Sequence, residues 1–404
     1  MVTENNATIV IVGTLDSKGE EVGFIRNRIV NRGCQAIVID AGVLGHPQIE
    51  ADITREKIAE LGGTTLERLK QRVNETSDRI EIIQVMIEGV KRAVTELVGK
   101  GELNGLISVG GSMGMAIGTS AMKMVPVGTP KLMIGTHFYS QYLGESDLTI
   151  MQSPCDIMGL NPVTELTLAQ GAEAICAMAS ATGPIRKKRP LVGMTGLGVT
   201  TQGVMLAQRL LKGKDYDTVV FHGNSVVMDE LVASGTIDGI LDFSPNELIR
   251  IFVIEETPWR MSRLDSAGEK GIPQVFVPGS LDMIVLRMAR EEIPEKYRDR
   301  KIYKHGPYIT GVRTTVEELK GLARVVSEKI NRAKGPRAVV FPLEGFSAID
   351  KKGSSFYDPD TDKAFLDELR ANINEEVKIV EVKAHILDPE FVETVVGVYD
   401  SMHK

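Results

Sequence analysis

The sequence of 404 residues has few cysteines and few aromatic residues, and it has no long apolar run. Its three cysteines, Cys34, Cys155 and Cys176, are odd in number and far apart, which excludes a disulfide framework and favours a reduced protein. No stretch approaches about eighteen uninterrupted apolar residues, so no membrane span is expected. The polar N-terminus lacks the basic-then-apolar order of a signal peptide. Together these absences predict a cytoplasmic protein.

Neither sign of charge is in large excess. Lys and Arg number 47 against 54 Asp and Glu, giving a net charge of -7. A mildly acidic chain binds polyanions poorly, so no nucleic-acid partner is expected. The six histidines show no H-x-x-x-H spacing and the cysteines no C-x-x-C spacing, so no metal site is predicted. The abundant features are hydrophobic residues (43%) and forty glycines, a composition that fits an α/β protein with many strand-to-loop turns.

Continuous β-branched runs alternate with helical patterns in the first half of the chain. Such runs are typical of central parallel strands that are covered by helices on both faces. The alternation predicts a parallel sheet with right-handed crossovers. The segment 43–79 is polar and irregular, and we interpret it as an insertion. The expected strands are 8–12, 36–40, 106–109 and 131–134, and the expected helices are about 19–32 and 80–98.

The segment 182–190 is predicted to be the joint between two domains, because it holds two prolines, a glycine and four consecutive basic residues. This composition is typical of an exposed linker. After it the chain repeats itself, because residues 191–196, 235–241 and 271–277 match residues 10–14, 101–107 and 128–134 in the same order. The ordered matches predict an internal duplication. We expect two Rossmann-like subdomains with mainly parallel sheets, residues 1–183 and 190–404, the second with extra C-terminal strands and helices.

The sharpest local signal is the glycine-rich segment 109–114, which follows a predicted strand and opens a helical stretch. Glycine turns let successive backbone N–H groups point into a concavity, and a helix N-terminus adds about half a positive charge. This combination binds phosphate without a basic side chain. The segment therefore predicts a phosphate cradle formed by Gly110, Gly111, Ser112 and Gly114.

A second polar loop, residues 13–18, follows the first strand. Thr14 and Ser17 could hydrogen-bond phosphate oxygens, and Lys18 could supply a cation. Asp16 could position a metal-bound water or a ribose hydroxyl. The predicted site also includes Gly13 and Asp40, since Asp40 ends the neighbouring strand, where an acidic residue often meets a ribose.

Two other interpretations of these loops remain open. The glycines could serve only as tight turns, and the Asp residues only as helix caps. Residues 110–114 also fit G-x-S-x-G, the nucleophile elbow of serine hydrolases, with Ser112 as the nucleophile. A dehydrogenase is not expected, because no G-x-G-x-x-G follows the first strand of either half.

In the second half, the corresponding residues 242–247 have no glycine pair. Their sequence is typical of a helix capping box that begins at Ser244. We therefore expect the second half to close the site or to bind another part of the ligand.

Several segments resemble the Tm-one-like ATP-binding domain family. The resemblance spans about residues 9–391 and is carried by segments 13–20, 109–112, 126–133, 278–283 and 341–350. It implies two Rossmann-like subdomains, an ATP site in the N-terminal one, and a homodimer, but no particular reaction. The chain departs from the family pattern at residues 136–140, 222–229, 242–245 and 305–307. The second half is therefore expected to bind a different ligand or none.

The leading hypothesis is a cytosolic ATP-binding protein whose phosphates lie on the two loops of the first half. An enzyme of this kind would transfer a phosphoryl group to a small acid or sugar, with Mg²⁺ neutralising charge. The first alternative is a non-catalytic regulator controlled by ATP. The second is a serine hydrolase that uses Ser112. The expected partners are a nucleotide, a small-molecule substrate and a second copy of the chain, and neither nucleic acid nor membrane.

Overall fold

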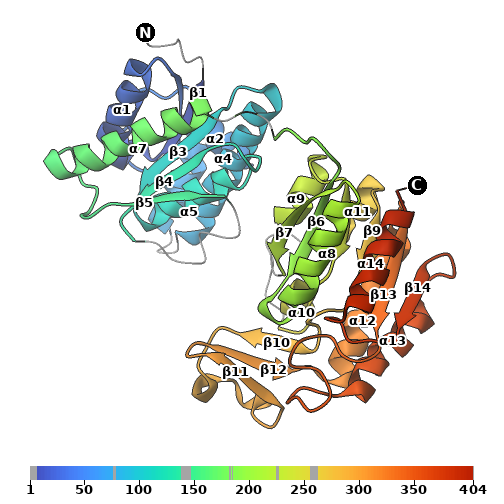
Figure 1. Ribbon diagram of the computed structural model, residues 1–404. Helices are drawn as coiled ribbons and strands as arrows, with labels where there is room; N and C mark the ends of the chain where they lie inside the picture. Colours follow the sequence, from blue (N-terminus) through green and yellow to red (C-terminus); the bar gives the residue numbers. More distant parts are fainter. Residues whose placement is uncertain are drawn as a thin grey trace. The chain divides into compact units, whose positions relative to one another are not determined.

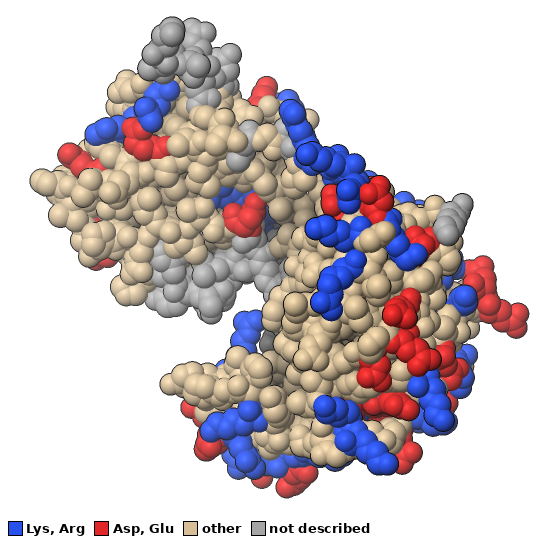
Figure 2. All heavy atoms as spheres, in the orientation of Figure 1, with Lys and Arg blue, Asp and Glu red and all other residues tan. Residues whose placement is uncertain are grey.

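The computed structural model describes residues 7–75, 79–137, 147–181, 183, 185–223, 227–254 and 263–403. The chain divides into two compact units, residues 1–185 and 186–404. Within the described ranges, no helix has the length and apolar character that crossing a membrane requires. On the face drawn in Figure 2, acidic and basic side chains are interspersed over the second unit, in keeping with the small net charge.

A five-stranded parallel sheet forms the centre of the first unit. Its strand order is β2-β1-β3-β4-β5, and every neighbouring pair is parallel. All residues of β3 and β4 are buried, as expected for mainly apolar strands that are covered on both faces. The strands are β1 (Thr8–Gly13), β2 (Gln35–Asp40), β3 (Gly105–Gly110), β4 (Lys131–Gly135) and β5 (Thr149–Gln152).

Helices cover both faces of this sheet (Figure 1). One face packs against α1 (Leu15–Asn31) and α7 (Pro162–Ala181) through strand residues such as Ile9 and Ile11. The other face packs, through Val10 and Val12, against four helices. These four are α2 (Arg55–Leu61), α3 (Leu66–Glu75), α4 (Ile80–Lys100) and α5 (Ser112–Met122). Odd-numbered and even-numbered residues of β1 therefore face opposite helix layers, because side chains alternate between the two faces of a strand.

The interpretation of residues 43–79 as an irregular insertion is wrong. This segment contains α2 and α3, which pack on α4 through buried residues such as Ile58 and Leu69. Polar residues dominate because both helices bury only a narrow stripe. The other elements lie close to their predicted ranges, although α1 begins at Leu15 rather than near residue 19.

The second unit repeats the strand order of the first. Its six-stranded parallel sheet has the order β14-β13-β9-β8-β6-β7, so β7-β6-β8-β9 corresponds to β2-β1-β3-β4. The prediction of two Rossmann-like α/β halves with parallel sheets is confirmed. The strands are β6 (Leu191–Gly196), β7 (Asp217–His222), β8 (Gly239–Asp242), β9 (Gln274–Phe276), β13 (Arg337–Pro342) and β14 (Lys378–Val382).

Helices again cover both faces of the sheet. Helices α8 (Thr201–Gly213) and α14 (Pro389–Ser401) lie on one face. The other face packs against α10 (Glu247–Phe252), α12 (Val316–Arg332) and α13 (Pro359–Asn372). The sequence did not indicate the small antiparallel sheet between β9 and α12, with strand order β10-β12-β11 (Figure 1). Its strands are β10 (Met283–Leu286), β11 (Ile302–Gly306) and β12 (Ile309–Arg313).

Substitutions at two glycines of α4, Gly89 and Gly99, test how closely α2 packs against α4. A Cβ at Gly89 would clash with the carbonyl oxygen of Ile58 in α2, whereas a Cβ at Gly99 would meet nothing within 4 Å. We expect Gly89→Ala to lower the free energy of unfolding by about 1–3 kcal/mol, because the helices must separate. Gly99→Ala, the matched control, should raise it by about 0.5 kcal/mol, since alanine favours helix. Urea denaturation measures both free energies of unfolding. An unchanged free energy of unfolding in Gly89→Ala would contradict the close contact between α2 and α4.

Candidate functional site

The strand order of the first unit creates a crevice at the carboxyl ends of β1 and β3. The chain leaves β1 for α1 on one face of the sheet and leaves β3 for α5 on the other face. Ligands of open α/β sheets bind where the connections diverge in this way. A cavity of about 620 Å³ lies at this position.

Both predicted loops line this cavity. The side chains and backbone of eight predicted site residues contribute to its wall, and they come from segments almost one hundred positions apart in the sequence. These residues are Thr14, Asp16, Ser17, Lys18, Gly110, Gly111, Ser112 and Gly114. The loops 13–18 and 110–114 therefore meet at one end of the sheet.

Gly13 and Asp40 lie outside the cavity wall. Asp40 is 1% exposed, and its Oδ1 accepts hydrogen bonds from the backbone N–H groups of Leu15 (3.0 Å) and Gly42 (2.8 Å). Burial raises the pKa of this carboxyl above its usual value. A Cβ at Gly13 would come within 2.6 Å of Val22. Both residues hold the loops in place beneath the cavity.

Asp16 fixes a third loop, residues 42–45, against the first turn of α1. Its Oδ2 accepts hydrogen bonds from the N–H groups of Val43 (3.1 Å) and Leu44 (2.9 Å). A Cβ at Gly42 would lie 2.8 Å from the Asp16 carboxylate carbon, so only glycine permits this contact. One oxygen of the Asp16 carboxylate is therefore already used by the protein backbone.

The turn at residues 14–18 presents two hydroxyls and one ammonium group. The Thr14 and Ser17 hydroxyl oxygens are 2.9 Å apart, and the Thr14 carbonyl accepts from the Lys18 N–H at 2.7 Å. Lys18 departs from helical geometry, with φ -133 and ψ 19. Its Nζ lies 3.8 Å from a carboxylate oxygen of Glu21, which is 2% exposed and accepts from the Gly159 N–H. This ion pair holds the ammonium group beside the cavity.

The loop after β3 leads directly into the N-terminus of α5. A Cβ at Gly110 would lie 2.8 Å from the Gly114 Cα, so this tight turn requires glycine. Gly111 has an ordinary φ of -77, and a Cβ there would meet nothing within 4 Å. The first N–H groups of a helix have no intrahelical acceptor. Together with the helix dipole, those of α5 form a site suited to an anion.

The remaining wall of the cavity is apolar and was not foreseen. Its residues belong to α3, α4 and α5, and Arg79 lies beside them at the start of α4. The helical periodicity of residues 80–98 indicated one buried face, but not that part of this face borders the loops. The apolar residues are Val73, Ile82, Ile83, Met86, Met113 and Ile117.

The geometry of Ser112 does not match a nucleophile elbow. In such an elbow the serine occupies a strained strand-to-helix turn. Among the described non-glycine residues, only Asp215, Leu264 and Ser280 have positive φ. No histidine is among the described residues that line the cavity. Within the described residues, neither a strained serine backbone nor a histidine at the cavity supports the hydrolase alternative.

At the carboxyl ends of β6 and β8, the corresponding place in the second unit, polar side chains bind one another. The Thr195 Oγ1 donates to Asp242 (2.6 Å) and accepts from the Ser244 N–H (2.8 Å), and the Ser244 hydroxyl lies 2.5 Å from that of Thr200. All four side chains are buried. Among the described residues at the ends of β6 and β8, these polar groups are therefore engaged with one another, whereas those of loops 13–18 and 110–114 line a cavity.

The predicted capping box at residues 244–247 is wrong. Helix α10 begins at Glu247, with Asn246 as its N-cap and no side-chain cap hydrogen bond. The Glu247 carboxylate instead pairs with the buried Arg263, at 2.7 Å from its Nη2. The sequence did not reveal this pair, because Arg263 follows Glu247 only sixteen residues later.

Of the segments that depart from the family pattern, residues 138–140 and 224–226 lie outside the described residues, and residues 305–307 lie at the end of β11.

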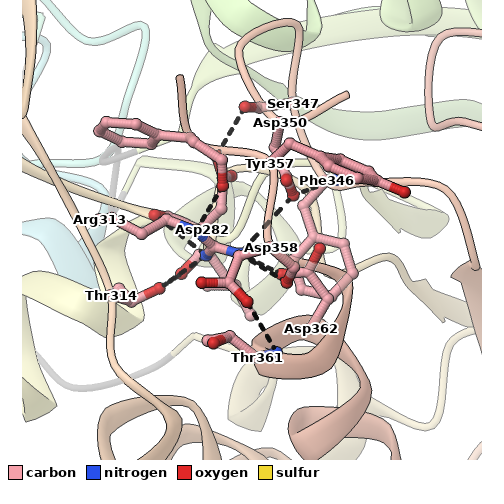
Figure 3. Close-up of polar contacts among 12 residues, drawn as sticks. Asp282, Arg313, Thr314, Phe346, Ser347, Asp350, Tyr357, Asp358, Thr361 and Asp362 are labelled. Atoms are coloured by element: carbon pink, nitrogen blue, oxygen red, sulfur yellow. Dashed lines mark hydrogen bonds and ion pairs between the residues drawn. The ribbon is translucent and has the colours of Figure 1, made fainter. Parts of the chain in front are cut away.

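A buried cluster joins the loops that follow β9 and β13 (Figure 3). Arg313 of β12 donates to the Phe356 carbonyl (2.9 Å) and to the Asp362 carboxylate (2.5 Å). The Ser347 hydroxyl donates to the Asp282 Oδ2 at 2.7 Å. Burial, and then the nearby Asp350 carboxylate, raise the pKa of Asp282 to about 7. Two segments that carry the family resemblance, 278–283 and 341–350, are therefore in contact in this buried cluster.

The substitution Asp282→Asn tests whether the Asp282 carboxyl is protonated in the folded chain. Because the pKa of Asp282 rises from 3.8 to about 7 on folding, the folded chain retains a proton that the unfolded chain releases. The resulting stability is complete below the unfolded pKa and is lost as the pH rises through about 7. We expect the wild-type Tm to fall between about pH 4 and about pH 7, and the Asp282→Asn Tm to fall less over this range.

The control is Asp367→Asn, which removes a half-exposed carboxylate that pairs with Lys363. This variant should keep the wild-type slope of Tm against pH. Equal slopes for Asp282→Asn and wild type would show that Asp282 is not protonated in the folded chain at neutral pH.

Comparisons with known proteins extend over the whole chain. The N-terminal domain of the Uncharacterised protein family (UPF0261) matches residues 7–184, and the C-terminal domain of the same family matches residues 189–403. A UPF0261 protein of Clostridium tetani is 38% identical over 96% of this chain and 96% of its own length. A UPF0261 protein of Rhizobium meliloti is 33% identical over 97% and 98% of the two chains.

A plant protein is also similar. The ToMV susceptible protein tm-1(GCR26) of Solanum lycopersicum is 33% identical over 80% of this chain and 45% of its own length. Among solved structures, a UDP-GlcNAc 2-epimerase from Neisseria meningitidis has 10% identity and a TM-score of 0.23, over 67% of this chain and 82% of its own. That similarity is too low to carry an argument. The resemblance to the Tm-one-like family is confirmed, and the chain belongs to the UPF0261 family.

Proposed function

We propose that the first unit binds a nucleotide, ATP in particular, with its phosphates on loops 13–18 and 110–114. The observation that carries this proposal is the meeting of both loops with the N-terminus of α5 in one cavity. Backbone N–H groups at a helix N-terminus favour an anion, and the Thr14, Ser17 and Lys18 side chains add hydrogen-bond donors.

The dimensions and chemistry of the cavity support this assignment. Its volume of about 620 Å³ falls within the range typical of small-molecule sites. Its lining combines the glycine turns and polar side chains of the two loops with apolar residues of α3 and α4, such as Val73 and Met86. A nucleotide has groups for both kinds of surface, since its phosphates are charged and its base is less polar.

The observed side chains favour binding without catalysis over phosphoryl transfer to a small acid or sugar. Asp16 is the sole carboxylate among the described residues that line the cavity, and its Oδ2 already accepts two backbone hydrogen bonds. A kinase needs a residue that orients or deprotonates the attacking group. We therefore favour an ATP-controlled regulator. Its cytosolic location and its assembly as a homodimer stay predictions from the composition and from the family resemblance. Release of inorganic phosphate or phosphorylation in a metabolite screen would instead support the enzyme.

Gly111→Val tests the nucleotide site. The φ of -77 at Gly111 suits valine, and the added atoms would enter open space in the cavity rather than the packed interior. We expect the variant to fold with a Tm close to that of wild type and to lose at least about tenfold in ATP affinity, because the side chain blocks the phosphate loop. Isothermal titration calorimetry measures the affinity, and circular dichroism the Tm.

The matched control is Gly198→Val in the second unit, where a Cβ would also meet nothing within 4 Å. This variant should bind ATP as the wild type does. Absence of ATP binding by the wild type, or undiminished binding by Gly111→Val, would remove the proposal.

The hydrolase alternative predicts a different reaction at the same loop. Because Ser112 lacks a strained backbone and no histidine lines the described part of the cavity, a fluorophosphonate probe should not label it. Intact mass spectrometry after incubation with the probe gives the result, with Ser112→Ala as the comparison. A mass increase that disappears in Ser112→Ala would restore the hydrolase interpretation.

A further inference from the structure

A buried carboxylate connects the cavity wall to a distant segment of the first unit. Glu21 of α1 is 2% exposed and is not among the described residues that line the cavity. Its Oε1 lies 3.8 Å from the Nζ of Lys18, which does line the cavity, and accepts a hydrogen bond from the Gly159 N–H at 2.9 Å. One oxygen atom therefore contacts both a cation of the site and a backbone group 138 positions away in the sequence.

The contact between Glu21 and Lys18 is ionic and loose. A hydrogen bond from an ammonium group to a carboxylate spans about 2.7–3.2 Å, whereas these two atoms are 3.8 Å apart. The Lys18 side chain is 18% exposed and lines the cavity. An anion in the cavity can therefore attract Lys18 without breaking a hydrogen bond between Lys18 and Glu21.

Glu21 depends on this cation because it is buried. An ionised carboxylate is costly to bury unless an opposite charge lies nearby. Among the described residues, Lys18 is the cation that pairs with Glu21. A phosphate beside Lys18 would weaken this pair and would also add negative charge near the carboxylate. The ionised Glu21 and a bound phosphate therefore oppose each other.

Residues 158–160 form the surface segment that Glu21 holds. The Gly159 N–H donates to Glu21, and the flanking Met158 and Leu160 are 78% and 39% exposed. The start of α7 is fixed independently of Glu21, because the side-chain oxygen of the residue before this helix accepts two N–H groups of its first turn. The Gly159 carbonyl stays attached to the same turn through a side-chain hydroxyl, at 3.0 Å. Residues 158–160 can therefore shift without unpacking α7.

We propose that Glu21 couples the nucleotide site to residues 158–160, because it competes with a bound phosphate for Lys18. The inference rests on the proposed function, since it requires a phosphate beside Lys18. In the free protein, Glu21 pairs with Lys18 and holds the Gly159 N–H. When a nucleotide binds, Lys18 pairs with its phosphate, Glu21 loses its counter-charge, and residues 158–160 are released so that water reaches the carboxylate. Glu21 is thus a positioning residue that lowers the affinity for nucleotide and transmits its binding to the surface.

The substitution Glu21→Gln tests this coupling, because glutamine loses the charge but keeps an oxygen that accepts from the Gly159 N–H. We expect this variant to bind ATP about threefold to tenfold more tightly than the wild type, since the opposing charge is gone. The control is Glu20→Gln, which removes the same charge from an exposed neighbour in α1 and should change the affinity by less than about twofold. Isothermal titration calorimetry measures the affinities, and circular dichroism should give both variants a Tm close to that of wild type.

Hydrogen–deuterium exchange of the full chain gives the second readout. In the wild type, saturating ATP should speed exchange at residues 157–161 by at least about threefold and should slow it at residues 13–18. In Glu21→Gln, ATP should still slow exchange at residues 13–18 but should leave residues 157–161 unchanged. A carboxylate that only stabilises the fold would not produce this difference between the two proteins.

The possible failures point to different causes. Equal or weaker ATP binding by Glu21→Gln would overturn the competition for Lys18 while leaving nucleotide binding intact. Unchanged or slower exchange at residues 157–161 of the wild type, at saturating ATP, would overturn the coupling to the surface. Absence of ATP binding by the wild type would instead remove the proposed function itself.

Discussion

The position of β1 between β2 and β3 is the constraint on which the site depends. Because α1 and α5 leave the sheet toward opposite faces, the loops that precede them diverge and leave a crevice between them. Glycine at positions 110 and 111 lets the chain turn there without filling the crevice. The second unit has the same strand order, yet at the ends of β6 and β8 the Thr195 and Ser244 side chains are engaged in buried hydrogen bonds. The strand order therefore permits a site, and the loop residues decide whether one forms.

Two carboxylates, the buried Asp40 and the half-buried Asp16, hold the loops of the site in place. Asp40 joins the first turn of α1 to Gly42, and Asp16 joins the same turn to residues 43 and 44. A buried carboxylate that receives two backbone N–H groups satisfies donors that would otherwise be costly to bury. These two acids are thus committed to the architecture of the loops. Contacts with a ligand are left to backbone N–H groups, hydroxyls and the two cations.

Much of the fold could be predicted because its signals are local. Strand runs such as 8–12 and the glycines at 110–114 lie within short windows, and the duplication shows as short segments that recur in the same order. The features that escaped prediction depend on distant residues. The apolar wall from α3 and α4, the pairing of Glu247 with Arg263 and the sheet around Arg313 each require knowledge of what packs nearby. Asp40 was placed at the correct strand end, but its partners were the protein's own N–H groups.

Hydrogen–deuterium exchange of the full chain with and without nucleotide tests the central claim most directly. If backbone N–H groups at the divergence of β1 and β3 hold the phosphates, ADP or ATP should slow exchange at residues 13–18 and 111–115. Exchange at residues 242–247 of the second unit should not change. Protection confined to the second unit, or unchanged exchange in both loops at saturating nucleotide, would contradict the account.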